Sequence, residues 1–374
     1  MANTKYSYDE KRKGWSTLVY DGTLTATGAK HRVRITSKKS SADLEKKVMA
    51  FKQQVAEGGA SKVSNITFGE YAEQWFETSK STRELNTQRT YRVILDSCFQ
   101  EIWYIPLNQL TYSHFQICVN AKKEHPRTCQ LLSMTFTQII KAAVRDRYLP
   151  RSAVLDITEG VSLPKYQKPI KRPLTELEKE ALSMANLEPM KRAFVSILYY
   201  CGLRKGEALA LTPSDFNWES KEVSITKAWA SDQIKPYPKS NNGVRNVPIP
   251  DAAIPLIRPY VESKDGYIFH GRTSEIMKET AYRRMWESIV YQMNEALGYN
   301  PYKNHKSEKQ IKGLTAHTFR HNYCTELCYQ IPTISTKMIA RLLGDNEKMV
   351  IEVYSHLVED KEKPADAVNN IFNL

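Results

Sequence analysis

Long apolar runs, paired cysteine motifs and glycine-rich nucleotide loops are all missing from this 374-residue sequence. No stretch approaches the roughly 18 uninterrupted apolar residues of a membrane-spanning helix, and the opening segment has no apolar signal-peptide core. The six cysteines contain no C-x-x-C pair, which is typical of reduced thiols in a cytoplasmic protein. Neither G-x-x-x-x-G-K-S/T nor G-x-G-x-x-G occurs. We therefore expect a cytoplasmic protein with no membrane partner and no bound nucleotide.

Positive charge is in excess, and it is concentrated at the N-terminus. The net charge is +13, and residues 1–62 contribute +7 of it through 13 Lys and Arg against 6 Asp and Glu. The phosphates of a nucleic acid are a natural counter-charge for such a segment. A solubilising basic tail would have the same composition, so charge alone leaves both interpretations open.

Residues 1–62 have the pattern of a small β-sheet backed by one helix. Residues 15–20 and 31–36 alternate like strands, Asp21-Gly22 predicts a tight turn, and the helix that follows has an apolar face of Leu44, Val48, Phe51 and Val55. A two- or three-stranded ribbon fits the major groove of DNA. This segment is therefore a candidate DNA-binding domain, or alternatively a protein-binding domain, and its candidate DNA contacts are Lys30, Arg32 and Arg34.

A helical domain is expected over residues 66–150. Thr67 and Glu70 form a T-x-x-E capping box, which marks the start of a helix. Further helical patterns cover about residues 87–98, 111–121 and 127–147. Exposed charges on helices commonly do no more than solvate a face, but three are candidates for contact with a DNA backbone, namely Lys122, Lys123 and Arg127.

Residues 151–172 are predicted to form an extended basic linker. Prolines at positions 150, 164, 169 and 173 interrupt any continuous helix. The segment also carries four candidate DNA-contacting cations, Lys165, Lys168, Lys171 and Arg172. A second capping box, Thr175 to Glu178, then marks the start of a domain over residues 173–374.

Four short clusters in residues 173–374 combine residue types that suit phosphate chemistry. In YYCGLRKGE (199–207) an apolar helix breaks at glycine and Arg204 stands at the turn, and PKSNNGVRNVP (238–248) is a turn-rich hairpin that presents Lys239. The third cluster is TAHTFRH (315–321). The fourth is LLGD (342–345), with Tyr354 nine residues after Asp345.

In this order and spacing the clusters resemble the tyrosine recombinase family, also called the phage integrases. The family has an arginine in a G-L-R-x-x-E setting, a hairpin lysine, an H-x-x-R pair and a tyrosine nucleophile near the C-terminus. The resemblance covers about residues 196–357 and implies catalytic roles for Arg204, Lys239, His317, Arg320 and Tyr354, with Glu207 supporting Arg204. The three-segment layout is similar to integrases of temperate phages and conjugative transposons, which have arm-binding, core-binding and catalytic domains.

These residue types fit the transfer of a phosphodiester to a phenol. The transition state carries extra negative charge on the non-bridging oxygens, which two guanidiniums can clamp, and preorganised donors are worth roughly 3 to 4 kcal/mol each. Thr315 is a candidate N-cap that would place His317 and Arg320 on one helical face, within reach of one phosphate. His317 could accept the tyrosine proton, while Lys239 would protonate the departing 5′ oxygen. The bond energy is kept in a 3′-phosphotyrosyl link, so neither ATP nor a metal cofactor is expected.

Asp345 departs from the family pattern, which has His or Trp at this position. A carboxylate beside a scissile phosphate would repel it unless the carboxylate is protonated, paired or turned away. Residues 344–346 predict a helix end followed by an N-cap, so we expect Asp345 to be turned away. Asp345 is therefore only a candidate supporting residue.

The sequence predicts a multidomain α+β protein, mainly helical with small β-sheets, that acts as a site-specific recombinase of a phage or conjugative transposon. From the resemblance we expect the substrate to be double-stranded DNA with core and arm sites, on which the protein forms a homotetramer. A directionality factor and a host DNA-bending protein are expected as further partners. The expected location is a bacterial cytoplasm, where the bound protein would be nucleoid-associated. A catalytically silent DNA-binding regulator and a topoisomerase-like relaxing enzyme are the alternatives. A last helix around residues 364–372 is predicted to pack either on its own domain or on a neighbouring protomer.

Overall fold

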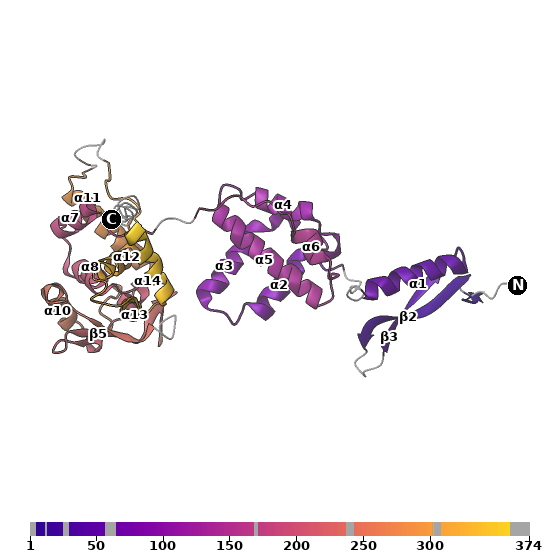
Figure 1. Ribbon diagram of the computed structural model, residues 1–374, viewed down its shortest axis with the longest axis horizontal. Helices are drawn as coiled ribbons and strands as arrows, with labels where there is room; N and C mark the ends of the chain where they lie inside the picture. Colours follow the sequence, from indigo (N-terminus) through magenta and orange to yellow (C-terminus); the bar gives the residue numbers. More distant parts are fainter. Residues whose placement is uncertain are drawn as a thin grey trace, which may run out of the picture. The chain divides into compact units, whose positions relative to one another are not determined.

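The protein consists of mainly helical units with small antiparallel sheets, as the sequence predicted (Figure 1). A computed structural model describes residues 5–11, 13–24, 30–56, 65–167, 171–236, 243–300, 302 and 308–359. The chain divides into two compact units, residues 1–168 and 169–374, and each is considered by itself. None of the helices in the described ranges is long and apolar enough to cross a membrane.

The N-terminal part of the first unit is a three-stranded antiparallel sheet with one helix, in the strand order β1-β2-β3. Its elements are β1 (Tyr8–Asp9), β2 (Gly14–Leu24), β3 (Lys30–Ser37) and α1 (Ser41–Ala56). Val19, Leu44 and Val48 are buried between sheet and helix. The predicted amphipathic helix is therefore confirmed, and it covers one face of the sheet.

The tight turn predicted at Asp21-Gly22 is wrong. Strand β2 continues to Leu24, which pairs with Lys30, and a register irregularity between Tyr20 and Leu24 takes up the turn-prone residues. The Asp21 carboxylate lies 2.6 Å from the His31 ring nitrogen on the opposite strand. Asp and Gly therefore lie where the pairing register shifts, within a strand that continues.

The opposite face of this sheet is basic and open to solvent. Arg34 pairs with Leu18, and Arg32 pairs with Tyr20. Because Val19 points toward α1 and side chains alternate along a strand, Leu18 and Tyr20 point away from the helix, and their partners share that face. The three candidate DNA contacts Lys30, Arg32 and Arg34 are all exposed there.

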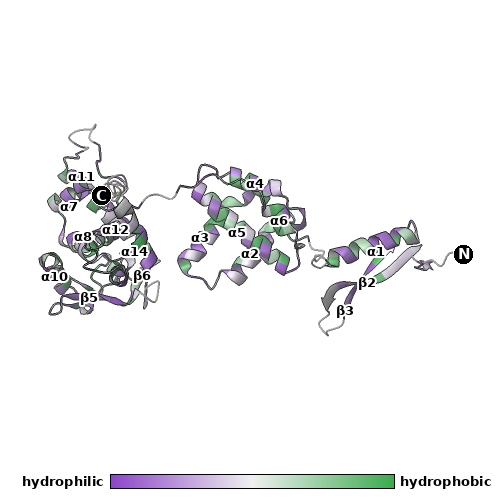
Figure 2. Ribbon diagram, in the orientation of Figure 1, coloured by the Kyte–Doolittle hydropathy of each residue, from purple (hydrophilic) through white to green (hydrophobic). Residues whose placement is uncertain are grey.

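The helical part of the first unit packs around stacked aromatic rings. Its helices are α2 (Phe68–Ser79), α3 (Leu85–Cys98), α4 (Tyr112–Asn120), α5 (Pro126–Arg145) and α6 (Ala153–Thr158). The capping box predicted at Thr67 and Glu70 is confirmed, with the Thr67 amide donating to Glu70 at 2.9 Å. Phe115 and Phe136 stack with ring centroids 4.0 Å apart. Figure 2 shows hydrophobic and hydrophilic residues alternating along these helices, as expected where one side of each helix is buried.

Helix α6 corrects the prediction that residues 151–172 are extended throughout. It occupies residues 153–158, and its Ala153 and Ile157 are buried in the core of the helical part, against α4 and α5. The prolines at 150 and 164 leave thirteen residues between them, enough for a short helix that tertiary packing stabilises. The linker is correspondingly shorter than predicted.

The second unit surrounds a central helix, α12 (Ala316–Cys328), which packs against α8 (Pro189–Cys201), α13 (Thr336–Leu343) and α14 (Glu347–Glu359). The other helices are α7 (Glu176–Met184), α9 (Lys205–Leu209), α10 (Ile254–Glu262) and α11 (Glu279–Ala296). One sheet has the order β4-β5-β8, and β6 and β7 form a separate hairpin. The strands are β4 (Phe216–Asn217), β5 (Glu222–Ile225), β6 (Ala228–Ala230), β7 (Gln233–Lys235) and β8 (Arg245–Pro248).

The predicted start of this unit is confirmed, since Thr175 and Glu178 form a capping box at the first residue of α7. Two other predictions fall outside the described residues, namely Lys239 and the last helix around residues 364–372.

Candidate active site

Gly202 ends helix α8 and sets the position of Arg204. Its φ of +62° lies in the left-handed region that favours glycine, and an added Cβ would meet the Tyr323 ring at 2.3 Å. The break predicted from the CGLR sequence is therefore confirmed, with both backbone conformation and close packing requiring glycine. Arg204 follows as the N-cap residue of the short helix α9.

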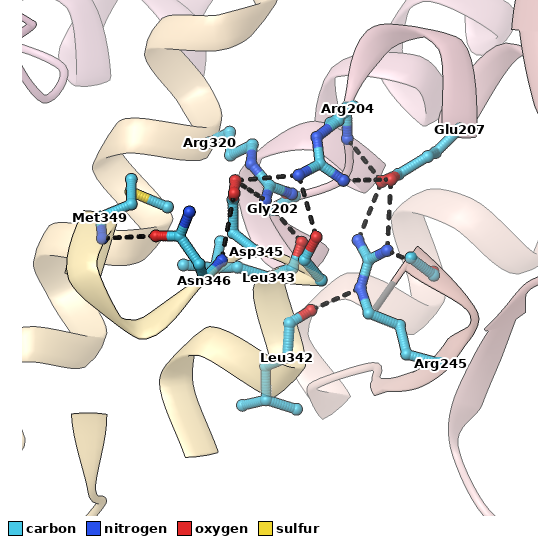
Figure 3. A network of polar contacts seen from close by, with 12 residues as sticks. Gly202, Arg204, Glu207, Arg245, Arg320, Leu342, Leu343, Asp345, Asn346 and Met349 are labelled. Atoms are coloured by element: carbon cyan, nitrogen blue, oxygen red, sulfur yellow. Dashed lines mark hydrogen bonds and ion pairs between the residues drawn. The ribbon is translucent and has the colours of Figure 1, made fainter. Parts of the chain in front are cut away.

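Arg204 is held by a carboxylate on one side and by the α13–α14 turn on the other (Figure 3). Its Nη1 donates to Glu207 Oε1 at 2.8 Å, while its Nη2 donates to the Gly344 carbonyl and to Asp345 Oδ2, both at 2.9 Å. The side chain remains 26% exposed. Arg204 is thus oriented by contacts within the protein, and part of its side chain remains accessible to a ligand from solvent.

Arg320 reaches the same place from helix α12. Thr315 is the N-cap of this helix, as predicted, so Arg320 lies in its second turn. Its Nη1 donates to the Gly202 carbonyl at 3.1 Å, and its Nη2 donates to the Leu343 carbonyl and, at 3.0 Å, to Asp345 Oδ2. Burial lowers the pKa of Arg320 to about 10, so the guanidinium stays charged at neutral pH.

The two arginines therefore converge on one anionic oxygen. The Nη2 atoms of Arg204 and Arg320 both donate to Asp345 Oδ2 (Figure 3). Our expectation that Asp345 is turned away is wrong, because Asn346 and not Asp345 caps α14, accepting from the Met349 amide at 2.9 Å. Partial burial alone would raise the pKa of Asp345, but the charges of both arginines outweigh it and lower that pKa.

His317 lies beside this centre on the first turn of α12. With Arg320, Asp345 and Lys171 it lines a small cavity of about 30 Å³. Loss of solvation, and then the charges of Arg320, Lys171 and Arg204, lower the pKa of His317. The ring is therefore largely neutral at neutral pH, which is the form that can accept a proton.

His321 stacks edge-on against His317 with ring centroids 4.6 Å apart. It lines the same cavity, and its buried Nε2 has no hydrogen-bond partner in the described part of the protein. Burial and the positive groups nearby lower the pKa of His321 to about 4. The described residues contain no group of three or more His, Cys, Asp or Glu side chains that could hold a metal ion.

Arg245 is a third guanidinium that the sequence reasoning missed. It is 2% exposed on strand β8, and its Nη2 donates to Glu207 Oε2 at 2.8 Å while its Nε donates to the Leu342 carbonyl at 2.7 Å. Burial would raise the pKa of Glu207, but Arg245 and Arg204 together lower it. Arg245 thus neutralises the carboxylate that orients Arg204. In the sequence it was one more polar residue of a turn-rich hairpin.

Tyr354 is not among the residues that line the small cavity. It is half-buried on α14, against an apolar cluster that includes Cys324, Leu343 and Val350. Helix α14 packs on α12, which carries His317 and Arg320. The structure therefore brings together Arg204, Arg320 and His317, and puts Tyr354 on the adjacent helix.

The predicted DNA contacts of the linker differ in their surroundings. Arg172 donates to both oxygens of the buried Glu178, at 2.6 and 2.7 Å, and so anchors the start of α7. Lys171 is exposed and lines the small cavity with His317. Lys165 is exposed in the first unit, as are Lys123 and Arg127, while Lys122 is half-buried and Lys168 lies outside the described residues.

The solved structures that are similar to this chain include two integrases. The integrase of transposon Tn1549 in complex with a circular intermediate DNA superposes with a TM-score of 0.64 at 18% identity, covering 83% of this chain and 100% of that one. A lambda integrase tetramer bound to a Holliday junction gives a TM-score of 0.58 at 12% identity, covering 94% of this chain and 95% of that one. At these identities the likeness establishes the fold.

The sequence comparison establishes the family. Residues 167–361, just over half of the chain, match the phage integrase family, and the chain belongs to that family. Tyrosine recombinase XerD of Pseudomonas aeruginosa is 25% identical over 219 residues, which cover 56% of this chain and 66% of that protein. The ICEBs1 integrase of Bacillus subtilis is 24% identical over 247 residues, covering 63% and 64%. The chain thus spans about two thirds of the length of these curated relatives, and the resemblance seen in the sequence is confirmed.

Proposed function

We propose that the protein is a site-specific DNA recombinase that cuts and rejoins DNA through a covalent bond to Tyr354. The observation that carries this proposal is the convergence of Arg204 Nη2 and Arg320 Nη2 on one anionic oxygen, at 2.9 and 3.0 Å. A non-bridging oxygen of a phosphodiester accepts hydrogen bonds from the same donors. Family membership and the position of Tyr354 on the neighbouring helix support the same reaction.

In the proposed reaction the Tyr354 oxygen attacks phosphorus and the bond from phosphorus to the 5′ oxygen breaks. His317 accepts the phenolic proton, as its lowered pKa allows, and Lys239 gives a proton to the leaving 5′ hydroxyl. Arg204 and Arg320 stabilise the negative charge that develops on the phosphoryl oxygens. Attack by another 5′ hydroxyl on the phosphotyrosyl bond then rejoins the strand and releases Tyr354.

We further propose that the three segments have separate tasks on DNA. The basic sheet face with Lys30, Arg32 and Arg34 would hold arm sites, and the helical part with Lys122, Lys123 and Arg127 would grip the core site together with Lys165, Lys168 and Lys171. Arg172 is assigned to anchoring helix α7 instead, because its guanidinium is already paired. A DNA-bound tetramer, a directionality factor and a host bending protein complete the proposal, in a bacterial cytoplasm.

A nicked suicide substrate that spans the ends of the mobile element tests this function. The wild-type chain should become covalently attached to this DNA and to no unrelated sequence. Tyr354→Phe should form no adduct while binding the same DNA, because only the nucleophilic oxygen is lost. Tyr302→Phe, at an 86% exposed tyrosine of the same unit, is the matched control and should react like wild type. Adducts on arbitrary DNA would indicate a topoisomerase, and binding without any adduct would indicate a silent regulator.

A further inference from the structure

The carboxylate of Asp345 occupies the position that the proposed function assigns to a phosphate oxygen. It is the acceptor on which the Nη2 atoms of Arg204 and Arg320 meet (Figure 3). Each of these Nη2 atoms also donates to a main-chain carbonyl, that of Gly344 for Arg204 and that of Leu343 for Arg320, so both of its hydrogens are engaged. A phosphodiester oxygen can therefore accept from both Nη2 atoms only if Asp345 leaves them.

The charges of the site also allow a phosphodiester to take the place of the Asp345 carboxylate. The network contains three guanidiniums, those of Arg204, Arg245 and Arg320, against the two carboxylates of Glu207 and Asp345. Glu207 is 2% exposed and paired with Arg245, so it is fixed in place. Asp345 is 30% exposed and joined to the chain through the α13–α14 turn, so it is the carboxylate that can move. Exchanging the Asp345 carboxylate for a phosphodiester leaves the net charge around the arginines unchanged, because each carries one negative charge.

Resting on the proposed function, we propose that Asp345 is an internal phosphate surrogate, which holds the two arginines in register until a DNA phosphate displaces it. Such a surrogate makes phosphate binding a competition and not a simple addition. It also keeps a buried guanidinium from being left uncompensated when no DNA is bound, a state that would destabilise the fold.

The surrogate connects phosphate binding to the nucleophile. Arg204 Nη2 donates to the Gly344 carbonyl as well as to Asp345, and Asn346 caps the helix that carries Tyr354. Release of Asp345 would therefore free one of the contacts that fix the start of α14.

Thermal unfolding in increasing inorganic phosphate, at constant ionic strength, tests the proposal without DNA or cleavage. Asp345→Asn keeps the size of the side chain and removes its charge. It should unfold at lower temperature than wild type without phosphate, and should bind phosphate at least tenfold more tightly. At phosphate concentrations well above both dissociation constants, this affinity gain corresponds to a rise in Tm larger than that of wild type by roughly 3 to 6 °C.

Asp251→Asn is the matched control, because it removes the same charge from a carboxylate of the same unit that is 78% exposed and paired with Lys221. Its phosphate response should equal that of wild type. Asp345→Ser provides a second test of the same position and should behave like Asp345→Asn.

The proposal is overturned if the phosphate response of Asp345→Asn is no larger than that of wild type. It is also overturned if neither variant at position 345 folds at any phosphate concentration, since phosphate then cannot replace the carboxylate. The assay does not involve Tyr354. Failure of adduct formation together with a normal phosphate exchange would therefore remove the proposed function and leave the surrogate role intact.

Discussion

The two units bury different kinds of side chain. In the helical part of the first unit, the core contains a cluster of phenyl rings in which Phe68, Phe99, Phe115 and Phe136 are all fully buried. In the second unit, the buried Arg320, Arg245 and Glu207 form a polar network under the surface, beside a large apolar core. Apolar burial stabilises a fold directly, whereas buried ion pairs contribute little net stability unless every partner is present. The first arrangement suits a scaffold, and the second suits a site that must meet a charged ligand.

The largest expected effect follows from removing Arg245. Arg245→Met should lower the free energy of unfolding by about 3 to 5 kcal/mol, because it leaves the buried Glu207 without its main partner. Cleavage should also fall by about 10²-fold, since Glu207 no longer holds Arg204 in one orientation. Denaturant unfolding and adduct formation on the suicide substrate measure the two losses.

Arg258→Met is the control for this prediction, because Arg258 pairs with Glu262 at about half exposure and should cost less than about 1 kcal/mol. If both substitutions lowered the free energy of unfolding equally, burial of the ion pair would not explain the effect of Arg245→Met.

The aromatic core should respond in stability alone. Phe136→Ala deletes a ring that stacks on Phe115 and should lower the free energy of unfolding by about 3 to 5 kcal/mol through lost burial and a cavity. Below the unfolding transition, and at saturating DNA, the cleavage rate should stay near that of wild type. Phe136→Leu keeps most of the volume and should cost much less. A cleavage defect in folded Phe136→Ala would show that this core also positions the site.

A smaller effect is expected from His321 and depends on pH. Its pKa is about 4 in the folded protein, against about 6.5 when unfolded, so only the unfolded state binds a proton between these values. The stabilising contribution is complete above pH 6.5 and is lost as pH falls toward 4, by about 3 kcal/mol in all. The lowered pKa values of Glu207 and Asp345 act with the same sign at lower pH, below about 4.5.

Denaturant unfolding at several pH values checks this prediction. Between pH 6.5 and 4, His321→Gln should lose stability less steeply than wild type, whereas His270→Gln, at an exposed histidine, should follow the wild-type slope. A slope unchanged by His321→Gln would rule out this histidine as the source.

The smallest effect is expected where charge is fully solvated, on the basic face of the N-terminal sheet. Arg34→Ala should leave stability nearly unchanged and reduce the slope of log K against log salt for arm DNA by about 1, the share of one phosphate contact. Lys46→Ala, at an exposed lysine of α1, is the control and should leave the slope unchanged. An equal reduction of the slope in both variants would show that arm DNA does not bind specifically to this face of the sheet.

Features set by neighbouring residues could be predicted from the sequence, and features set by distant ones could not. The capping boxes at Thr67 and Thr175 and the glycine break before Arg204 are local, and all three are confirmed. Helix α6 was missed because its stability comes from packing on α4 and α5. The register shift next to Asp21 looked like a turn because Asp and Gly are typical of both.

The polar network shows the same limit. Glu207 was expected to support Arg204 from three residues away, but its second partner, Arg245, lies 38 residues further along the chain. The pairing of Asp345 with Arg204 spans 141 residues. A local pattern of helix end and cap suggested the opposite orientation for Asp345, and attraction to two guanidiniums far away in the sequence, the partly exposed Arg204 and the buried Arg320, decided it.

Besides the two carboxylates, main-chain oxygens hold all three guanidiniums, those of Gly202, Gly243, Leu342, Leu343 and Gly344. No point mutation deletes a carbonyl group. A substitution at one of these positions therefore leaves the accepting atom in place and reaches the arginines only by shifting the backbone, so the orientation of the guanidiniums depends on the path of the main chain.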